Sequence, residues 1–410
     1  MSENVTLTNE PATSGSGFWQ RQIPLWLFLF ALFVRIGHWV DSSHDVTHGF
    51  MDFHWLAGAP VSDAMTWVTF AETIQRGCGE NHDWVARRPL YGYFLASIFS
   101  LTKSHILVAQ WANVLMSSLS VVFLYSISRR LFGVVAGLGT ALWFCFEPHS
   151  IVLSTITLSE TMGSFFTIWH VWLLVRGTQE GKGNLVGAGL TFAAANLTRT
   201  LSLFALPLEV LLIWLVCGKR DKSIFKGFRV AFVFGASASA LLILGMLRNW
   251  WMVGIFTISD NTASILYAAT SPEHGAWSAY VEHEATELGI TTNKERYSFY
   301  MKKAVENLKE HTDLYVSRVQ KLSWVVIGES MVSPWFYWPQ FAYIGALVLL
   351  GFDRIRRASF RHESTKSIML FTALVLSVIA FILLGLDIRC RYVLWGFAAL
   401  AQDNTDGNKH

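Results

Sequence analysis

The sequence predicts an all-α, polytopic membrane protein with about ten transmembrane helices and a range of roughly nine to twelve. Only 15% of its 410 residues are charged, and the mean hydropathy is +0.38. A soluble domain carries about 25% charged residues. The charges are also unevenly placed, because several long stretches contain no Asp, Glu, Lys or Arg. Both observations predict a chain that lies mostly in lipid.

The charge-free stretches set the positions of most of the predicted spans. They are Ser104–Ser128, Thr161–Val175, Asn184–Thr198, Val230–Leu247, Ser330–Phe352 and Ser367–Leu386. Several approach the roughly 20 residues that cross about 30 Å of hydrocarbon. Helices are expected because backbone groups in lipid must form their hydrogen bonds within their own segment.

The first span contains the charge-free run Gln22–Val34, and two short spans flank Arg199. At 1.5 Å per residue, each of these two spans is about 22 Å long, which places Arg199 near a membrane surface or in a cavity. Leu90–Leu101 is apolar but too short to span, so it is expected to be interfacial or packed in the first long loop. We expect helices at about 23–40, 106–126, 133–147, 161–176, 184–198, 201–217, 230–247, 339–352, 367–386 and 391–401.

Basic residues mark alternate loops of this arrangement. They are Arg129 with Arg130, Arg176 with Lys182, the run Lys219–Arg229 and the run Arg354–Lys366. Because cytoplasmic loops are enriched in Lys and Arg, the pattern predicts a cytoplasmic N-terminus. Residues 1–20 are then a disordered cytoplasmic tail, residues 21–402 one transmembrane domain, and residues 403–410 a polar tail. The two long loops, 41–103 and 248–329, face outward.

The four cysteines give no disulfide framework. Cys145 and Cys217 lie in apolar segments and are expected to be core thiols. Cys78 and Cys390 are both predicted to be external, and only their geometry decides whether they pair.

Asp63 is the first candidate for chemistry. It opens the amphipathic run SDAMTWVTFAETI in the first external loop. The alternative is that Asp63 only caps a juxtamembrane helix, where an acid also suits the helix dipole. Spacing alone favours the cap.

Basic residues on the external side form a second candidate. Arg87 and Arg88 directly precede Pro89, Leu90 and Tyr91. Four more arginines lie at predicted outer helix ends: Arg199, Arg248, Arg389 and Arg391. Contacts with lipid headgroups are one reading. Topology signals would place these charges on the other side, however, and the planar guanidinium suits bidentate phosphate binding. The pattern therefore favours a phosphate or pyrophosphate site near the outer leaflet.

Glu160 lies in LSET, where an external loop re-enters an apolar helix. An ionisable group at that position indicates a functional site, and the alternative is a first-turn acid with Ser159 as the cap. The chain has no GxxxxGK[ST], HExxH or CxxC motif. His44, His48 and His54 fit ordinary loop histidines better than a metal site.

Several motifs in order resemble the GT-C superfamily of integral membrane glycosyltransferases, in particular the bacterial branch similar to protein O-mannosyltransferases and the lipid A aminoarabinose transferase. The family pattern D-x-x-x-Y-x-x-x-A corresponds to Asp63, Trp67 and Ala71, and the basic residue with Pro-Pro-Leu-Tyr corresponds to Arg87–Tyr91. Later landmarks are RRLFGVVAGLGTALWFCFEP, LSETM, NLTRT, RNWWMVGIFTIS and RYVLWGFAALA. The chain departs from the pattern at Ala64, Trp67 and Arg88.

This resemblance, which covers about residues 20–400, implies a GT-C-like transmembrane domain in a bacterial inner membrane, with its active site on the external face. It implies a hexosyl- or pentosyltransferase that takes sugar from a polyprenyl-phosphate donor, with inversion at the anomeric carbon. Asp63 would be the general base, the arginines and Tyr91 would bind donor phosphate, and Glu160 would orient a substrate. The acceptor is a protein, lipid or glycan.

Membrane lipids are the other expected partners, and nucleic acid is not expected. The sequence assigns no cofactor and no metal ligands, and it leaves open whether a divalent cation is required. One rival interpretation is a transporter or flippase of a lipid-linked saccharide, which would not need Asp63. The other is a catalytically inactive scaffold of the same fold, which the Ala64 departure leaves open.

Overall fold

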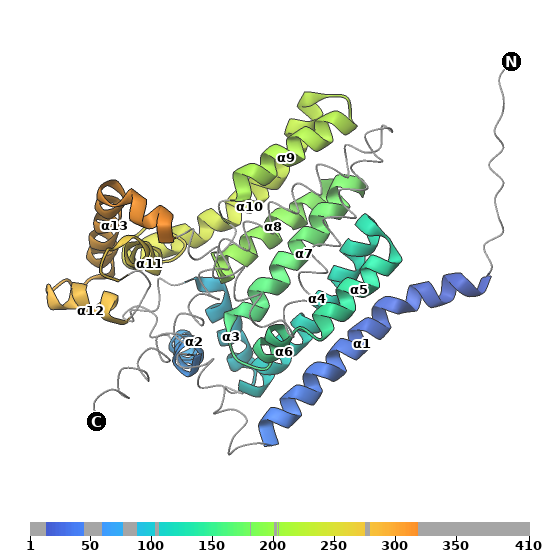
Figure 1. Cartoon of the computed structure of the whole chain (residues 1–410), viewed down its shortest axis with the longest axis horizontal. Helices are drawn as coiled ribbons and strands as arrows, with labels where there is room; N and C mark the ends of the chain where they lie inside the picture. The colour runs from blue at the N-terminus through green and yellow to red at the C-terminus, as the bar shows by residue number, and fades with distance from the viewer. Residues whose placement is uncertain are drawn as a thin grey trace.

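The computed structural model describes residues 14–44, 60–76, 88–102, 106–180, 182–200, 203, 205–274 and 279–318. Within these ranges all regular structure is helical, and Figure 1 shows the arrangement. The expected helices beyond residue 318 lie outside the described residues, as do Cys78, Arg87, Arg389, Cys390 and Arg391.

A bundle of slanted, side-by-side helices forms the body of the molecule (Figure 1). In chain order these are α1 (Ser14–His44), α4 (Ile106–Phe132), α5 (Val134–Cys145), α7 (Ser159–Glu180), α8 (Lys182–Thr198), α9 (Ala205–Arg220) and α10 (Ile224–Val253). Short α6 (Pro148–Ser154) joins α5 to α7. The bundle matches the expected order of spans, although α1 begins inside the segment expected to be a tail.

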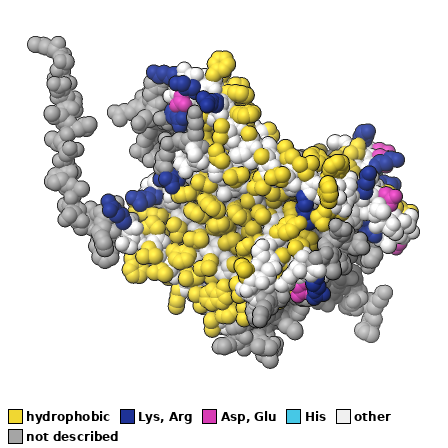
Figure 2. Space-filling view, turned by 180° about the vertical axis from the view of Figure 1, so that it is seen from behind, with side chains coloured by type: hydrophobic (Ala, Val, Ile, Leu, Met, Phe, Trp, Pro, Cys, Tyr) yellow, Lys and Arg dark blue, Asp and Glu magenta, His cyan; other side chains and the backbone are white. Residues whose placement is uncertain are grey.

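Three of the described helices, α1, α4 and α10, are long and apolar enough to cross a membrane. Hydrophobic side chains cover the face of the bundle seen in Figure 2. Exposed apolar side chains of the bundle helices include Phe30, Phe33, Leu115, Leu119, Leu211, Leu215, Phe228, Phe232, Ile243 and Leu244. So many exposed apolar side chains indicate contact with lipid. The predicted all-α, polytopic membrane class is confirmed.

Two shorter helices pack against one end of the bundle. They are α2 (Pro60–Gln75) and α3 (Pro89–Thr102), and α3 buries Tyr91, Leu95 and Phe99. Trp67 and Phe70 of α2 join the same core. Thus the apolar segment Leu90–Leu101 is packed between helices.

A separate group of helices lies beyond the end of α10 (Figure 1). It consists of α11 (Asn261–Thr270), α12 (Ala279–Glu287) and α13 (Asn293–Glu310). Tyr267, Val281 and Tyr300 form its core, while Lys302 and Lys303 are exposed. Helix α13 is therefore amphipathic, with its apolar side on α11.

Arg35 is a fully buried charge in α1 whose role the sequence did not indicate. Its Nε donates to Ser117 Oγ at 2.7 Å, and its terminal nitrogens donate to the carbonyl of Ala31 at 3.2 Å and to the carbonyl of Phe144 at 3.4 Å. Phe144 lies in the last turn of α5, where unpaired carbonyls favour a cation. Arg35 therefore fixes α1 to α4 and to the end of α5.

The bundle also depends on close contact between α8 and α10 at Gly189. A Cβ atom there would lie 2.0 Å from Ser237 Oγ and 2.6 Å from the backbone oxygen of Phe234. A Cβ at Gly183, at the start of the same helix, would meet no atom within 4 Å. The contact at Gly189 thus requires a residue without a side chain.

We expect Gly189→Ala to destabilise the protein by about 1–3 kcal/mol, because the helices must separate to accept the methyl group. Gly183→Ala is the matched control and should leave stability unchanged. The measurement is the thermal unfolding midpoint of the purified protein in detergent. Equal midpoints for the two variants would contradict the close α8–α10 contact.

Candidate active site

The centre of the candidate site is an ion pair between Glu160 and Arg199. Glu160 lies in the first turn of α7, and Arg199 directly follows α8. Arg199 Nη1 contacts Glu160 Oε1, with only 11% and 14% of the two side chains exposed. Arg199 keeps its backbone N–H bonded to Ala195 at 2.7 Å, so its position continues the helix. We call the end of the bundle that carries this pair the Glu160 end.

Gly163 makes room for the arginine. It lies one turn after Glu160, and a Cβ there would be 3.2 Å from Arg199 Cγ. The aliphatic stem of Arg199 therefore runs close along the backbone of α7. This contact explains how a long side chain can lie largely buried across two helices.

Tyr91 and Asn113 continue the site toward α3 and α4. Asn113 is fully buried, and its Nδ2 donates to the carbonyl of Ile156 at 2.7 Å, which ties α4 to the segment before α7. The pKa of the fully buried Tyr91 hydroxyl is raised, mainly by burial. The Asn113 side chain lowers this pKa by less, and the negative charge of Glu160 adds to the rise. Tyr91 is therefore a neutral hydrogen-bond donor at physiological pH, and not an acid or base.

Several buried polar atoms around the ion pair make no hydrogen bond within the described residues. These atoms are Tyr91 Oη, Asn113 Oδ1, Thr157 Oγ1 and Arg199 Nε. Buried polar groups in proteins almost always have a partner. A site with donors and acceptors from four segments of the chain therefore suits a polar ligand, and the free guanidinium N–H of Arg199 suits an anion.

Arg248 binds α3 at the same end. Its Nε donates to Tyr93 Oη at 3.2 Å, and its guanidinium lies 5.2 Å from the centre of the Tyr93 ring. Its Nη1 donates to Asn249 Oδ1 at 2.7 Å. Asn249 Nδ2 in turn donates to the carbonyls of Thr257 and Ile258. Arg248 thus joins α10 and the loop that follows it to α3.

Two other predicted site residues, Arg88 and Asp63, lie at the starts of α3 and α2. Arg88 directly precedes α3 and is half-buried. Asp63 lies in the first turn of α2, and its side chain is outside the described residues. The helix begins at Pro60, because proline is favoured at the first helical position. The interpretation of Asp63 as the capping residue is therefore wrong, although a first-turn acid still suits the dipole.

Asn113 and Thr157 are the members of the site that the sequence analysis missed. Both are ordinary polar residues in or near apolar helices, and only their contacts across the bundle single them out. Cys145 and Cys217 are buried free thiols, as predicted. Among the described residues, no three His, Cys, Asp or Glu side chains lie close enough to hold a metal ion.

A comparison with known protein families gives a match over the part of the chain that forms most of the candidate site. Residues 86–251 match the pattern of the dolichyl-phosphate-mannose-protein mannosyltransferase family. The chain is similar to the GT-C mannosyltransferases. The match confirms the resemblance and indicates a mannosyltransferase-like membrane glycosyltransferase. No curated protein matches the chain.

The matched range of the mannosyltransferase family contains most of the candidate site. Arg87, Arg88, Tyr91, Glu160, Arg199 and Arg248 lie inside it, whereas Asp63, Arg389 and Arg391 lie outside. The family similarity thus covers the bundle from α3 through most of α10.

A double-mutant cycle tests the ion pair. Arg199→Leu should destabilise the protein by about 3 kcal/mol, because it leaves the Glu160 carboxylate largely buried without its cation. Adding Glu160→Gln should recover much of this loss. The measurement is again the thermal midpoint.

Arg76→Leu is the control for this cycle, because its ion pair with Glu72 is solvent-exposed and at 3.2 Å has ordinary geometry. Exposed pairs contribute little, so its midpoint should stay unchanged. Independent, additive effects of Glu160→Gln and Arg199→Leu would show that the two side chains do not interact.

Proposed function

We propose that the protein transfers a sugar from a polyprenyl-phosphate donor to an acceptor hydroxyl at the external face of the membrane. The observation that carries the proposal is a set of buried polar atoms around the Glu160–Arg199 pair that have no hydrogen-bond partner in the described part of the chain. It lies within the range that matches a family whose name specifies a lipid-phosphate sugar donor. The donor phosphate would be the ligand that satisfies Arg199 Nε and Tyr91 Oη.

The charge distribution supports an external site. Exposed basic residues gather at the opposite end of the bundle, in and beside the turn between α9 and α10 (top of Figure 2). They are Lys219, Lys222, Lys226 and Arg229. Because cytoplasmic ends are enriched in Lys and Arg, the Glu160 end would face outward. The donor headgroup would then meet the site in the outer leaflet.

The chemistry follows from a phosphate leaving group. The acceptor oxygen attacks the anomeric carbon, and the bond from that carbon to the phosphate oxygen breaks, so the configuration inverts. Asp63 takes the proton of the acceptor hydroxyl as general base. Polyprenyl phosphate leaves as an anion that needs no proton. Arg199 and Arg88 would stabilise its growing negative charge, a contribution that is often the largest in such sites.

Glu160 has a positioning role in this proposal. Its carboxylate holds Arg199 by one terminal nitrogen, and the Nε of the guanidinium has no hydrogen-bond partner among the described residues. A bound phosphate would meet a fixed donor group, so less conformational entropy would be lost on binding.

Asp63→Asn should abolish sugar transfer, because an amide cannot accept the proton of the acceptor hydroxyl. The measurement is the transfer of labelled sugar from polyprenyl-phosphate donor by protein reconstituted in liposomes. Asp83→Asn, which changes another acid of the same loop, is the control and should keep activity. Full activity in Asp63→Asn would exclude Asp63 as the base.

Arg199→Lys should raise the KM for the donor about tenfold, because lysine keeps the charge but loses the planar fork that binds phosphate. The KM for the acceptor should not change. Arg176→Lys is the control, since Arg176 lies over the Trp172 ring at the far end of α7, 4.7 Å from the ring centre. Unchanged donor KM in Arg199→Lys would place the phosphate elsewhere.

Mass spectrometry of membrane lipids and surface glycans, with and without the protein, would identify sugar and acceptor together. A glycosylated product should disappear and its polyprenyl-linked precursor should accumulate. Movement of the intact lipid-linked sugar across the liposome membrane, with no new glycosidic bond, would instead identify a transporter.

A further inference from the structure

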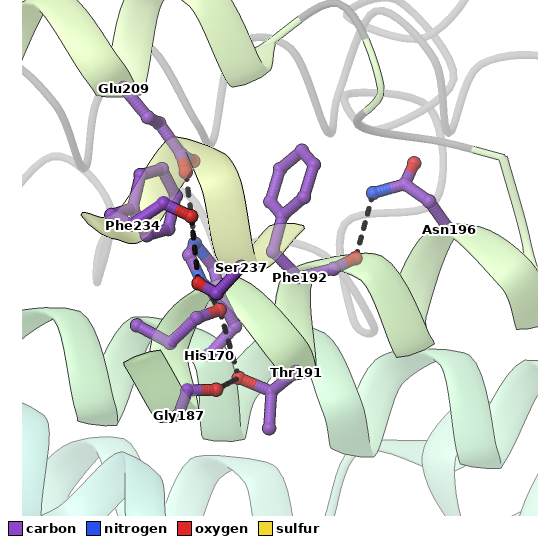
Figure 3. A network of polar contacts seen from close by, with 9 residues as sticks. His170, Gly187, Thr191, Phe192, Asn196, Glu209, Phe234 and Ser237 are labelled. Carbon is purple, nitrogen blue, oxygen red and sulfur yellow. Dashed lines mark hydrogen bonds and ion pairs between the residues drawn. The ribbon is translucent and has the colours of Figure 1, made fainter. Parts of the chain in front are cut away.

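A second pair of ionisable side chains lies inside the bundle, away from the Glu160 end. His170 is in the middle of α7 and Glu209 is near the start of α9. His170 Nε2 lies 3.1 Å from Glu209 Oε2, with 4% and 5% of the two side chains exposed. Figure 3 shows the pair among residues of α7, α8, α9 and α10. Ionisable groups at such depth are costly in a membrane protein and usually have a function.

The hydrogen bonds of His170 define the charge of the pair. Its Nδ1 lies 2.8 Å from the carbonyl oxygen of Ala188 in α8. A carbonyl oxygen only accepts, so Nδ1 must carry a proton. The contact with Glu209 then contains one proton, on the imidazole or on the carboxyl group. Both arrangements are neutral overall, which suits a site enclosed by the rings of Phe192 and Phe234.

His170 and Glu160 lie on the same side of α7. The positions of Glu160, Gly163, Thr167 and His170 follow one another at intervals of three or four residues, which is the spacing of one helix face. Gly163 contacts Arg199, and His170 contacts α8 and α9. This polar face of α7 is therefore the surface against which α8 and the start of α9 pack.

The two ion pairs hold both sides of the connection between α8 and α9. Arg199, at the end of α8, is held by Glu160, while Glu209, within the first turns of α9, is held by His170. Pro207 lies in the first turn of α9, where proline favours helix initiation. Arg199 precedes the first residue of α9, Ala205, by only six positions, so movement of α9 along α7 would disturb Arg199 at its contacts with Glu160 and Gly163.

We propose that His170 and Glu209 are positioning residues that set the place of Arg199 at the donor phosphate. They act through the start of α9 and do not touch substrate. This inference rests on the proposed function, because it gives Arg199 the phosphate-binding role. If the pair only held the bundle together, its loss would lower stability without raising the donor KM more than the acceptor KM.

The test measures the donor and acceptor KM of three variants in the reconstituted protein. Glu209→Leu removes the pair and leaves a neutral imidazole, so the donor KM should rise about three- to tenfold while the acceptor KM stays unchanged. Glu209→Gln keeps a side chain that can hydrogen-bond His170 and should restore the wild-type donor KM. Thr178→Val is the control: Thr178 is buried in the same helix as His170, but its hydroxyl donates to the carbonyls of Leu174 and Val175, away from the pair. Figure 3 shows that Thr191, in contrast, shares the network of the pair.

Glu209→Leu is also made in an Arg199→Lys background. This comparison distinguishes an effect on the position of Arg199 from a general loss of stability. With the guanidinium fork already lost, Glu209→Leu should raise the donor KM no further. An equal rise in both backgrounds, or an equal rise in donor and acceptor KM, would overturn the proposal. If Glu209→Leu does not fold, His170→Gln replaces it, with a smaller rise in donor KM expected in the wild-type background only.

A thermal cycle distinguishes failure of this inference from failure of the proposed function. If no variant or wild-type protein transfers sugar, the proposed function fails. The coupling between the His170–Glu209 pair and Arg199 can still be measured in that case. It follows from the thermal unfolding midpoints of Glu209→Leu, Arg199→Lys and the double variant. Non-additive shifts support the link, and additive shifts overturn it.

Discussion

The ion pair between Glu160 and Arg199 joins the start of α7 to the end of α8, and the geometry of the candidate site depends on this contact. Glu160 lies in the first turn of α7 and Arg199 directly follows α8, so the pair fixes two closely packed helices to each other. The segment before α7 is bonded to Asn113 of α4, which in turn lies beside Tyr91 of α3. Four segments distant in the sequence are thus linked, contact by contact, to the Glu160–Arg199 pair.

Lipid imposes a second constraint, because every ionisable group within the bundle must be neutralised or fully hydrogen-bonded. Arg35 meets this need with hydroxyl and carbonyl oxygens from α1, α4 and the end of α5. His170 and Glu209 meet it by sharing a proton. These groups also join helices that apolar packing alone leaves free to slide, since lipid tails compete equally well for apolar side chains. The buried polar groups therefore define the relative heights of the helices.

The sequence predicted the long helices of the bundle well, because charge-free stretches and their flanking basic residues reflect the thickness of the membrane. It did not predict α6, α11 or α12, which are short and lie outside those stretches. It predicted Glu160 and Arg199 individually, because the sequence alone shows a charged residue at the end of an apolar stretch. It did not predict that they pair, nor that His170 and Glu209 do, because a contact between α7 and α9 depends on helix rotation and packing. Asn113 and Arg35 were missed for the same reason. The start of α2 was misplaced because Pro60 was not read as its first helical residue.

The central claim is that the polar groups around Arg199 hold the phosphate of a lipid-linked sugar donor. The most direct measurement is an electron cryomicroscopy map of the protein in a lipid nanodisc with polyprenyl phosphate bound. The account predicts phosphate density within hydrogen-bonding distance of Arg199 and Tyr91, with the sugar position open toward α2. Phosphate density at the basic turn between α9 and α10, with none near Arg199, would contradict it.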